Sequence, residues 1–362
     1  MKIVADEDIP LIKYYFGDTV LKPGREITQK DLIDADILLV RAVTPVNQAL
    51  LEGTKVKFVG TTTTGIDHLD TEFLDHAGIL YASAFSCNAD AVAEYVICTI
   101  ARLQTLGFLT GKKPRAAVIG VGNTGRRVVQ KLKLLGFNVV VCDPPRAMLD
   151  ENFISCPLDE IHDVDLVTLH TPLTKEGLYP TYHLINKDFL TRQKKQCILM
   201  NTSRGSVISS SDLKLYGEHL VWCLDVWENE PEIDVEIMAR ALLATPHIAG
   251  YTVESKYRAV AMVYDAAYKL NLLKNAHIPL FKMPKTKFSF ENKTVDWREV
   301  VLKVYDPAST TKLMKSKMID GNAFDVLRKN FQERHEFGYI ELRDLNLKNE
   351  DQRIIQALFI SH

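Results

Sequence analysis

The stretch Ala116-Ala-Val-Ile-Gly-Val-Gly-Asn-Thr-Gly125 is an apolar run that ends in three glycines, with the spacing Gly120-x-Gly122-x-x-Gly125. A helical pattern follows directly, and then comes a second apolar run, Asn138-Val-Val-Val-Cys142, which is closed by Asp143. A strand, a glycine turn, a helix, a second strand and an acid in this order predict a Rossmann-type, doubly wound dinucleotide-binding unit.

Each part of this pattern has a physical role in holding a dinucleotide. Gly120 permits the tight turn, Gly122 lets the backbone approach the pyrophosphate, and Gly125 lets the helix pack close to the strand. The helix N-terminus then offers free N–H groups to the phosphates. Asp143 accepts hydrogen bonds from ribose hydroxyls and repels a 2′-phosphate, which favours NAD over NADP, although Arg146 nearby is a cation that acts in the opposite sense.

Composition limits the class of protein. The 362 residues suffice for two or three domains, and a net charge of −2 gives no sign of a nucleic-acid partner. The chain enters a strand-like run at once, without a signal peptide or a membrane-spanning stretch, so we expect a cytoplasmic protein. The six cysteines form no C-x-x-C pair and the ten histidines show no metal-binding spacing, which predicts reduced thiols and no metal.

The apolar pattern predicts three domains. Residues 1–92 with 256–280 are expected to form a small α/β domain that binds substrate, 93–255 the nucleotide-binding domain, and 281–362 a C-terminal α+β domain. Long helices are expected over 88–106 and 252–275, a short one near 324–331, and a strand over 339–342. The other expected strands are 2–5, 36–40, 56–60, 79–82, 116–121, 138–142, 166–170, 197–201, 220–224 and 242–245.

Three polar segments follow strands of the expected nucleotide-binding sheet, where open α/β sheets bind their ligands. They are Asn201-Thr-Ser-Arg204-Gly205, Asp225-Val-Trp-Glu228-Asn-Glu230-Pro231 and Thr245-Pro-His247-Ile-Ala-Gly250-Tyr251. An arginine can grip a carboxylate, a histidine can take the proton of an alcohol, and a carboxylate can orient that histidine. The set therefore predicts a dehydrogenase site, and the spacing leaves either glutamate as the partner of the histidine. His170 and His183 are interpreted as structural.

These motifs, in this order, resemble the D-isomer-specific 2-hydroxyacid dehydrogenases over about residues 1–280. One subgroup of that family is similar in further segments, which are Arg41 with Val43-Thr44, Gly60-Thr-Thr-Thr-Thr-Gly65-Ile-Asp-His68, Cys87-Asn88, Cys142-Asp-Pro-Pro-Arg-Ala147 and His247-Ile-Ala-Gly-Tyr251. The run Phe324-Asp-Val-Leu-Arg-Lys-Asn-Phe-Gln-Glu-Arg-His-Glu-Phe337 resembles an extra dimerisation domain of this subgroup. The resemblance implies a smaller flavodoxin-like domain beside the Rossmann domain, and a homodimer formed through the C-terminal domain.

The resemblance also implies roles for residues. Arg204 binds substrate, and Glu230 pairs with His247, the proton donor and acceptor. The residues implied to contact NAD are Gly120, Gly122, Asn123, Thr124, Gly125, Asp143, Thr171, Thr202, Ser203, Asp225 and Gly250. Those implied to contact substrate are Thr63 and Tyr251, with Arg41 and Arg258 as candidates for its phosphate; a structural ion pair for Arg41 and a solvated charge for Arg258 are the alternatives.

The implied reaction is the NAD-dependent oxidation of 4-phospho-D-erythronate to 2-oxo-3-hydroxy-4-phosphobutanoate, a step in pyridoxal phosphate (pyridoxine) biosynthesis. Ala42 departs from the subgroup, which usually has a serine here, and one lost hydrogen bond costs on the order of 1 kcal/mol. The alternatives are a related dehydrogenase acting on 3-phosphoglycerate or glyoxylate, and an NAD-sensing interaction protein that retains the fold.

Overall fold

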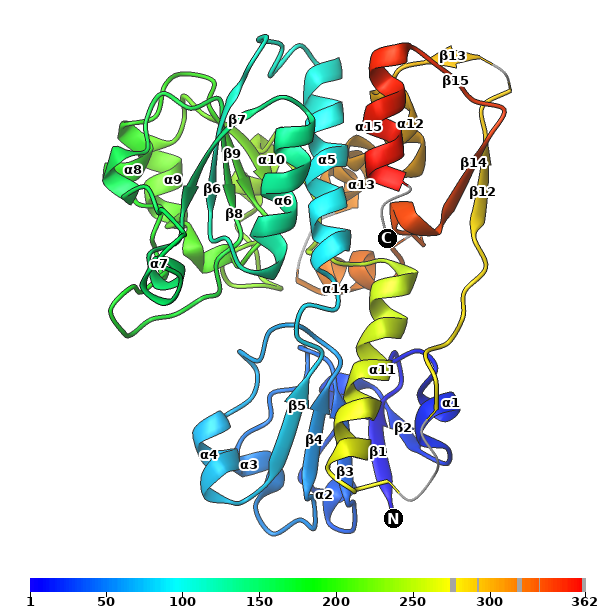
Figure 1. Cartoon of the computed structure of the whole chain (residues 1–362). Helices are drawn as coiled ribbons and strands as arrows, with labels where there is room; N and C mark the ends of the chain where they lie inside the picture. The colour runs from blue at the N-terminus through cyan, green and yellow to red at the C-terminus, as the bar shows by residue number, and fades with distance from the viewer. Residues whose placement is uncertain (274–277, 292, 318–320, 332, 360–362) are drawn as a thin grey trace. The chain divides into compact units, whose positions relative to one another are not determined.

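The computed structural model describes residues 1–273, 278–291, 293–317, 321–331 and 333–359. The chain divides into two compact units. Unit 1 comprises Met1–Asn88 and Thr252–Pro284, and unit 2 comprises Ala89–Tyr251 and Lys285–His362 (Figure 1). Unit 1 is therefore discontinuous in sequence. The C-terminal residues belong to the same unit as the nucleotide-binding sheet, and the three-domain division of the chain stays a prediction.

Unit 1 contains a five-stranded parallel sheet in the order β2-β1-β3-β4-β5. Its strands are β1 (Ile3–Asp6), β2 (Val20–Lys22), β3 (Ile37–Val40), β4 (Phe58–Thr61) and β5 (Leu80–Ser83). This strand order is the flavodoxin-like one, which confirms the predicted fold of this unit. The short edge strand β2 was not predicted, because two of its three residues are exposed and it lacks an apolar run.

Helices cover both faces of this sheet. On one face α1 (Ile12–Phe16) and α11 (Val253–Lys269) bury Tyr15 and Tyr264 against β1, β3 and β4. The other face is covered by α2 (Gln29–Leu32), α3 (Gln48–Leu51) and α4 (Thr71–His76). The prediction of a helix over 252–275 was too long, because α11 ends at Lys269 and Asn271 adopts a left-handed φ of 57°. Residues 274 and 275 lie outside the described residues.

Unit 2 is built on a six-stranded parallel sheet in the order β11-β10-β9-β8-β6-β7. The strands are β6 (Arg115–Ile119), β7 (Asn138–Cys142), β8 (Leu166–Leu169), β9 (Ile198–Asn201), β10 (Val221–Leu224) and β11 (Leu243–Ala244). All six were predicted, and the doubly wound fold is confirmed. The strand order reverses at β6, which has β7 on one side and β8 on the other, so the topological switch point lies between β6 and β8.

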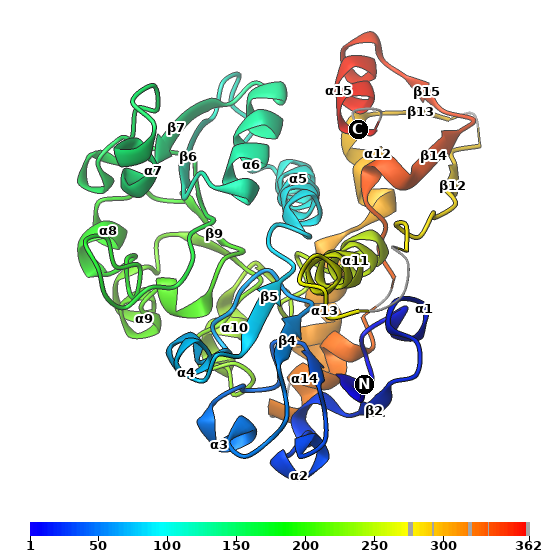
Figure 2. The ribbon, with the colours of Figure 1, turned by 60° about the horizontal axis from the view of Figure 1, so that its bottom comes forward.

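The two faces of this sheet are covered by different helices (Figures 1 and 2). One face packs against α5 (Ala89–Thr105) and α6 (Asn123–Leu134). The other packs against α8 (Lys187–Thr191), α9 (Ser210–Tyr216) and α10 (Val235–Arg240). The short helix α7 (Pro144–Leu149) follows β7 and has no buried residue.

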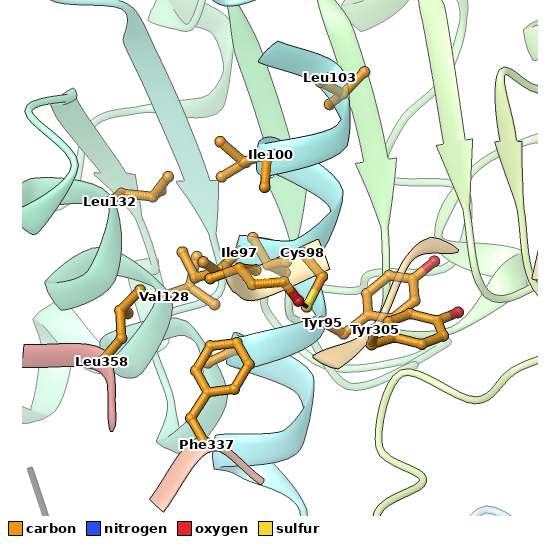
Figure 3. Close-up of a cluster of buried hydrophobic side chains, with 14 of the residues drawn as sticks. Tyr95, Ile97, Cys98, Ile100, Leu103, Val128, Leu132, Tyr305, Phe337 and Leu358 are labelled. Carbon is orange, nitrogen blue, oxygen red and sulfur yellow. Dashed lines mark hydrogen bonds between the residues drawn. The ribbon is translucent and has the colours of Figure 1, made fainter. Parts of the chain in front are cut away.

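The C-terminal region packs on α5 and α6. It contains α12 (Trp297–Val304), α13 (Pro307–Lys317), α14 (Gly321–Lys329) and α15 (Asn349–Phe359). Its strands pair in parallel, β12 (Thr286–Ser289) with β14 (Ile340–Arg343) and β13 (Thr294–Val295) with β15 (Asn346–Leu347). Figure 3 shows Tyr305 of this region beside Tyr95 of α5, and Leu358 beside Val128 of α6, with Phe337 in the same cluster. Because its apolar side chains share a core with α5, this region is anchored to the nucleotide-binding sheet.

The remaining composition-based expectations concern cysteines, metals and membranes. All six cysteines are free thiols, and five of them are buried. Within the described part of the chain, no group of three or more histidine, cysteine, aspartate or glutamate residues is arranged to hold a metal ion. Among those same residues, every helix is too short or too polar to cross a membrane.

Candidate active site

The glycine loop after β6 lies at the switch point of the unit 2 sheet. Gly120 has a φ of 84°, and a Cβ added to it would lie 2.7 Å from the carbonyl carbon of His170 and 2.8 Å from the nitrogen of Thr171. A Cβ on Gly125 would collide with the Gly120 carbonyl oxygen, whereas a Cβ on Gly122 would meet no atom within 4 Å. The crowded glycines are required by packing, and the open one leaves space for a pyrophosphate at the N-terminus of α6, beside Asn123 and Thr124.

Asp143 follows β7 and organises the same loop. Its Oδ2 accepts a hydrogen bond from the Val121 N–H at 2.7 Å, and its Oδ1 accepts one from the Arg146 N–H at 3.1 Å. Each carboxylate oxygen has a second lone pair, so both can still accept from a ribose hydroxyl. The Arg146 guanidinium donates to the Val121 carbonyl at 2.9 Å and lies 4.3 Å from the centre of the Phe153 ring. Arg146 is therefore engaged within unit 2, close to Asp143.

The end of β8 contributes Thr171, whose side-chain oxygen is buried and lacks a hydrogen-bond partner among the described residues. Beside it, His170 Nδ1 lies 3.2 Å from the hydroxyl of Thr202, and Nε2 lies 2.9 Å from that of Thr168. Burial lowers the pKa of His170 to about 3, so its ring is neutral and serves as a hydrogen-bonding spacer. A buried hydroxyl that lacks a partner is expected where a ligand completes the site.

These features fit a dinucleotide. An open glycine at a helix N-terminus, a carboxylate after the second strand and an unsatisfied hydroxyl all lie at one end of the sheet, close to its switch point. Gly120, Gly122, Asn123, Thr124, Gly125, Asp143, Thr171 and Thr202 are the residues that would hold NAD there.

The loop after β9 carries Arg204. The buried Asn201 side chain accepts hydrogen bonds from the N–H and hydroxyl of Ser203, at 3.0 and 2.8 Å, and donates to the Arg204 carbonyl at 2.9 Å. The Arg204 Nη1 donates to the Ser203 carbonyl at 2.9 Å. A Cβ on Gly205 would collide with the Trp227 carbonyl, so only glycine allows this loop to lie against the next one.

Asp225 fixes the loop that carries His247. It is 1% exposed, and its Oδ1 accepts from the Thr245 hydroxyl at 2.6 Å and the Ile248 N–H at 2.8 Å. Its Oδ2 accepts from the Ala249 N–H at 2.9 Å, and its backbone carbonyl accepts from the His247 N–H at 2.7 Å. Burial raises the pKa of Asp225 despite these donors. Asp225 thus organises the histidine loop, while its contact with NAD, like that of Gly250, stays a prediction.

His247 is paired with Glu230, and not with Glu228. The Glu230 Oε2 lies 2.7 Å from His247 Nδ1, and Oε1 accepts from the Trp227 N–H at 2.8 Å. Burial raises the pKa of Glu230, but the charge and hydrogen bond of His247, with the charge of Arg328 and the Trp227 N–H, outweigh it, and the net pKa is lowered. His247 has a left-handed φ of 55°, a conformation in which the Asp225 hydrogen bonds hold it.

Glu228 forms a second carboxylate–histidine pair. Its Oε1 lies 2.7 Å from His183 Nε2, and its Oε2 accepts from the Ser210 N–H at 3.2 Å, at the start of α9. The His183 ring stacks on Tyr182 with 3.9 Å between the ring centres. Sequence spacing could not show which glutamate pairs with His247, because Glu228 is engaged by His183, which lies in another loop.

The structure also places a residue that sequence reasoning missed. Arg328 of α14 donates from Nη2 to the hydroxyl of Tyr251, at 2.8 Å. Arg328 lies on the apolar side of its helix, with Phe324 and Leu327. A charged residue within an apolar helical stripe was the signal that could have identified it.

The other predicted substrate residues belong to unit 1: Arg41 and Thr63 follow the carboxyl ends of strands, and Arg258 lies in α11. Arg41, after β3, donates to both carboxylate oxygens of Asp6, at 2.8 and 3.1 Å, and to Asp8 at 2.7 Å. Thr63, after β4, donates to the Gly65 carbonyl at 2.9 Å, and Arg258 of α11 donates to the Cys87 carbonyl at 3.2 Å. The structure therefore gives Arg41 the ion pair that was its alternative interpretation.

Comparison with known proteins shows what this chain is similar to. The family model for the NAD-binding domain of D-isomer specific 2-hydroxyacid dehydrogenases matches residues 102–249. A crystal structure of an NAD-dependent formate dehydrogenase from Staphylococcus aureus in complex with NAD superimposes with a TM-score of 0.62, at 23% identity over 75% of this chain and 96% of that chain. An NAD-bound 3-phosphoglycerate dehydrogenase from Entamoeba histolytica also superimposes with a TM-score of 0.62, at 22% identity over 78% of this chain and 99% of that chain. These two likenesses show the fold.

The family model, together with the relatives named next, shows an NAD-dependent oxidoreductase of the D-isomer-specific 2-hydroxyacid dehydrogenase class. Relatives similar along the whole length narrow this class. An erythronate-4-phosphate dehydrogenase from Coxiella burnetii (strain RSA 331 / Henzerling II) is 42% identical over 348 residues, 94% of this chain and 95% of the relative. One from Escherichia coli O157:H7 is 39% identical over 353 residues, 93% of this chain and 92% of the relative. The chain belongs to the erythronate-4-phosphate dehydrogenase family.

Proposed function

We propose that this chain oxidises 4-phospho-D-erythronate to 2-oxo-3-hydroxy-4-phosphobutanoate with NAD, in the synthesis of pyridoxal phosphate. The observation that carries the proposal is the 2.7 Å contact between His247 Nδ1 and Glu230 Oε2, on loops that follow β11 and β10 of the unit 2 sheet. The names of the relatives, which match nearly the full length of the chain, supply the substrate.

The proton transfer follows from the pairing of His247. Because Nδ1 is engaged by Glu230, Nε2 is the ring nitrogen that exchanges a proton with the 2-hydroxyl of the substrate. The lowered pKa of Glu230 keeps its carboxylate ionised, so it stabilises the imidazolium that forms when His247 accepts the proton.

The other residues bind and orient. When bound, NAD supplies the hydride acceptor. Arg204, whose loop is shaped by Asn201 and Gly205, grips the substrate carboxylate and polarises the reacting carbon–oxygen bond. We also propose that four residues contact the substrate: Arg41, Thr63, Tyr251 and Arg258. Three further residues are proposed to contact the cofactor: Ser203, Asp225 and Gly250.

The proposal extends to assembly and location. We expect a homodimer formed through the C-terminal region, which resembles the extra dimerisation domain of the subgroup. We expect the protein to work in the cytoplasm, where its free thiols stay reduced. The mass of the purified protein in solution and fractionation of source cells test these two expectations.

Turnover on a panel of acids tests the substrate. The panel contains 4-phospho-D-erythronate, 3-phospho-D-glycerate, D-lactate and D-glycerate, each with an added 2-keto acid acceptor in case NADH stays bound. Strong preference for 4-phospho-D-erythronate supports the proposal. Preference for another acid would retain the mechanism and reject the pathway, and Ala42 would be the first residue to replace. NAD binding without turnover on any acid would favour an NAD-sensing protein.

A further inference from the structure

Two arginines of the C-terminal region hold the segment that follows His247. Arg328 of α14 donates from Nη2 to the Tyr251 hydroxyl at 2.8 Å. Its guanidinium carbon lies 5.4 Å from the centre of the Tyr251 ring and 5.9 Å from that of Phe324. Arg328 is thus fixed between an aromatic residue of its own helix and one that directly follows the histidine loop.

The second arginine, Arg334, binds the backbone of Ala249, two residues before Tyr251. Its Nη2 donates to the carbonyls of Ala249, at 2.5 Å, and of Ala91, at 2.9 Å. The Ala249 N–H donates to Asp225, so the N–H and the carbonyl of Ala249 are both hydrogen-bonded. Their two partners, Asp225 and Arg334, come from different parts of unit 2. The segment after His247 is therefore held at the backbone of Ala249 and at the side chain of Tyr251.

Arg328 is also a shielded charge. Its Nε is buried and lacks a hydrogen-bond partner among the described residues. Burying a cation is costly unless opposite charge compensates it. Burial lowers the pKa of Arg328, but the interactions with Tyr251, Glu230 and Asp325 outweigh it, and the net pKa is raised. The acids near this cation include the one that pairs with His247.

We infer that Arg328 is a positioning residue of the active site: it fixes the hydroxyl of Tyr251, next to the loop that carries His247, and supplies a positive charge that acts on Glu230. The inference rests on the proposed function, in which that pair moves the proton. It gives the C-terminal region a direct part in the reaction, in addition to any part in assembly.

The charge makes this role testable. The charged groups around Glu230 are His247, on the loop after β11, and Arg328 on α14, with Asp325 next to Arg328 and Asp225 facing His247. Arg328 is one of the groups that lower the pKa of Glu230. Without it that pKa rises, so Glu230 becomes protonated, and stops orienting His247, at a higher pH than in the unaltered protein.

The test compares Arg328→Gln, which removes the charge, with Arg328→Lys, which keeps it. Arg343→Gln is the matched control, because Arg343 lies on β14 and pairs with Glu341. We expect Arg328→Gln to lower kcat about tenfold and to move the acid limb of kcat/KM to higher pH, with unchanged NAD affinity. Arg328→Lys should keep the acid limb and lose part of kcat, and Arg343→Gln should match the unaltered enzyme.

A second readout needs no substrate. Titration of the ¹³C-labelled Glu230 carboxyl, assigned with Glu230→Gln, should show a higher midpoint in Arg328→Gln than in the unaltered protein. If no acid is turned over, the proposed function fails while this titration still tests the inference. A folded Arg328→Gln with an unchanged midpoint and an unchanged acid limb would overturn it. If Arg328→Gln does not fold, Arg328→Lys and Tyr251→Phe test the inference in its place. A wild-type kcat in both of these variants would overturn the inference.

Discussion

Glu228 and Glu230 lie two residues apart, and each holds a histidine nitrogen at 2.7 Å, yet their surroundings differ. The Glu228–His183 pair also caps the Ser210 N–H, and its histidine stacks on Tyr182. The Glu230–His247 pair is joined to the Trp227 N–H, and its histidine loop is bound by Asp225. Both histidines have a left-handed φ, 51° for His183 and 55° for His247. The His183 N–H donates to the Ser206 carbonyl at 2.8 Å, whereas the loop of His247 is held by the buried carboxylate of Asp225. Because a carboxylate–histidine contact is common to both pairs, we expect this difference between the loops to separate their functions.

The largest expected effect separates the two histidines. His247→Ala should lower kcat by roughly 10²–10⁴-fold and leave NAD binding intact, because it removes the proton acceptor and spares the glycine loop. His183→Ala should keep a kcat close to wild type. Steady-state kinetics and NAD titration by fluorescence measure both. Unchanged turnover in His247→Ala would remove His247 from the mechanism and make His183 the candidate.

The next effect separates the glutamates. Glu230→Gln should lower kcat by roughly 10²-fold, because an amide neither orients the ring with a full charge nor stabilises imidazolium. Glu228→Gln should keep kcat and lower the free energy of unfolding by about 1–2 kcal/mol, through weaker hydrogen bonds to His183 and Ser210. Kinetics and denaturant titration of the two variants give the comparison, and equal losses of kcat would contradict it.

A third prediction concerns Asp225, whose carboxylate holds the loop of His247 and not that of His183. Asp225→Asn should destabilise the protein by about 1–3 kcal/mol, because an amide can accept only through one oxygen and faces backbone donors with its NH₂. We also expect a fall in kcat from the freed His247 loop. Urea unfolding and kcat are the measurements; wild-type values for both would show that the loop is held without Asp225.

The smallest expected effect is a pH dependence. Burial raises the pKa of Glu228, but the hydrogen bonds of His183 and Ser210 outweigh it, so the folded pKa lies below the ordinary 4.5. A depressed folded pKa adds stability above pH 4.5, and this is lost as pH falls through the folded value. The Tm difference between wild type and Glu228→Gln should therefore shrink as the pH is lowered below 4.5. A constant difference would show that charge contributes nothing.

Local spacing was enough to predict much of this molecule. The glycine loop, Asp143 and all six strands of the unit 2 sheet follow from neighbouring residues, because period and turn chemistry act over a few positions. The order of the strands in unit 1 was predicted through resemblance, and the short exposed β2 was missed. The end of α11 was placed too late, because apolar residues continue beyond Lys269.

The site was harder to predict wherever a contact joins distant segments. His183 and Glu228 are 45 positions apart, and Arg328 and Tyr251 are 77 apart, so neither spacing nor period relates them. The collision that makes Gly205 necessary is likewise with Trp227, on another loop. Family resemblance chose Glu230 correctly as the partner of His247, whereas the residues alone left both glutamates open.

The discontinuity of unit 1 has a consequence for synthesis. One face of its sheet is covered by α11, which buries Val260, Val263 and Tyr264 against strands made from the first 88 residues. A ribosome must therefore complete all of 89–251 before the covering helix emerges, a delay on the order of ten seconds or more at ordinary elongation rates. During that time the nascent chain exposes the part of this apolar sheet face that α1 does not cover. A chaperone that shields such surfaces should raise the yield of this protein more than that of a truncated chain holding unit 2 alone.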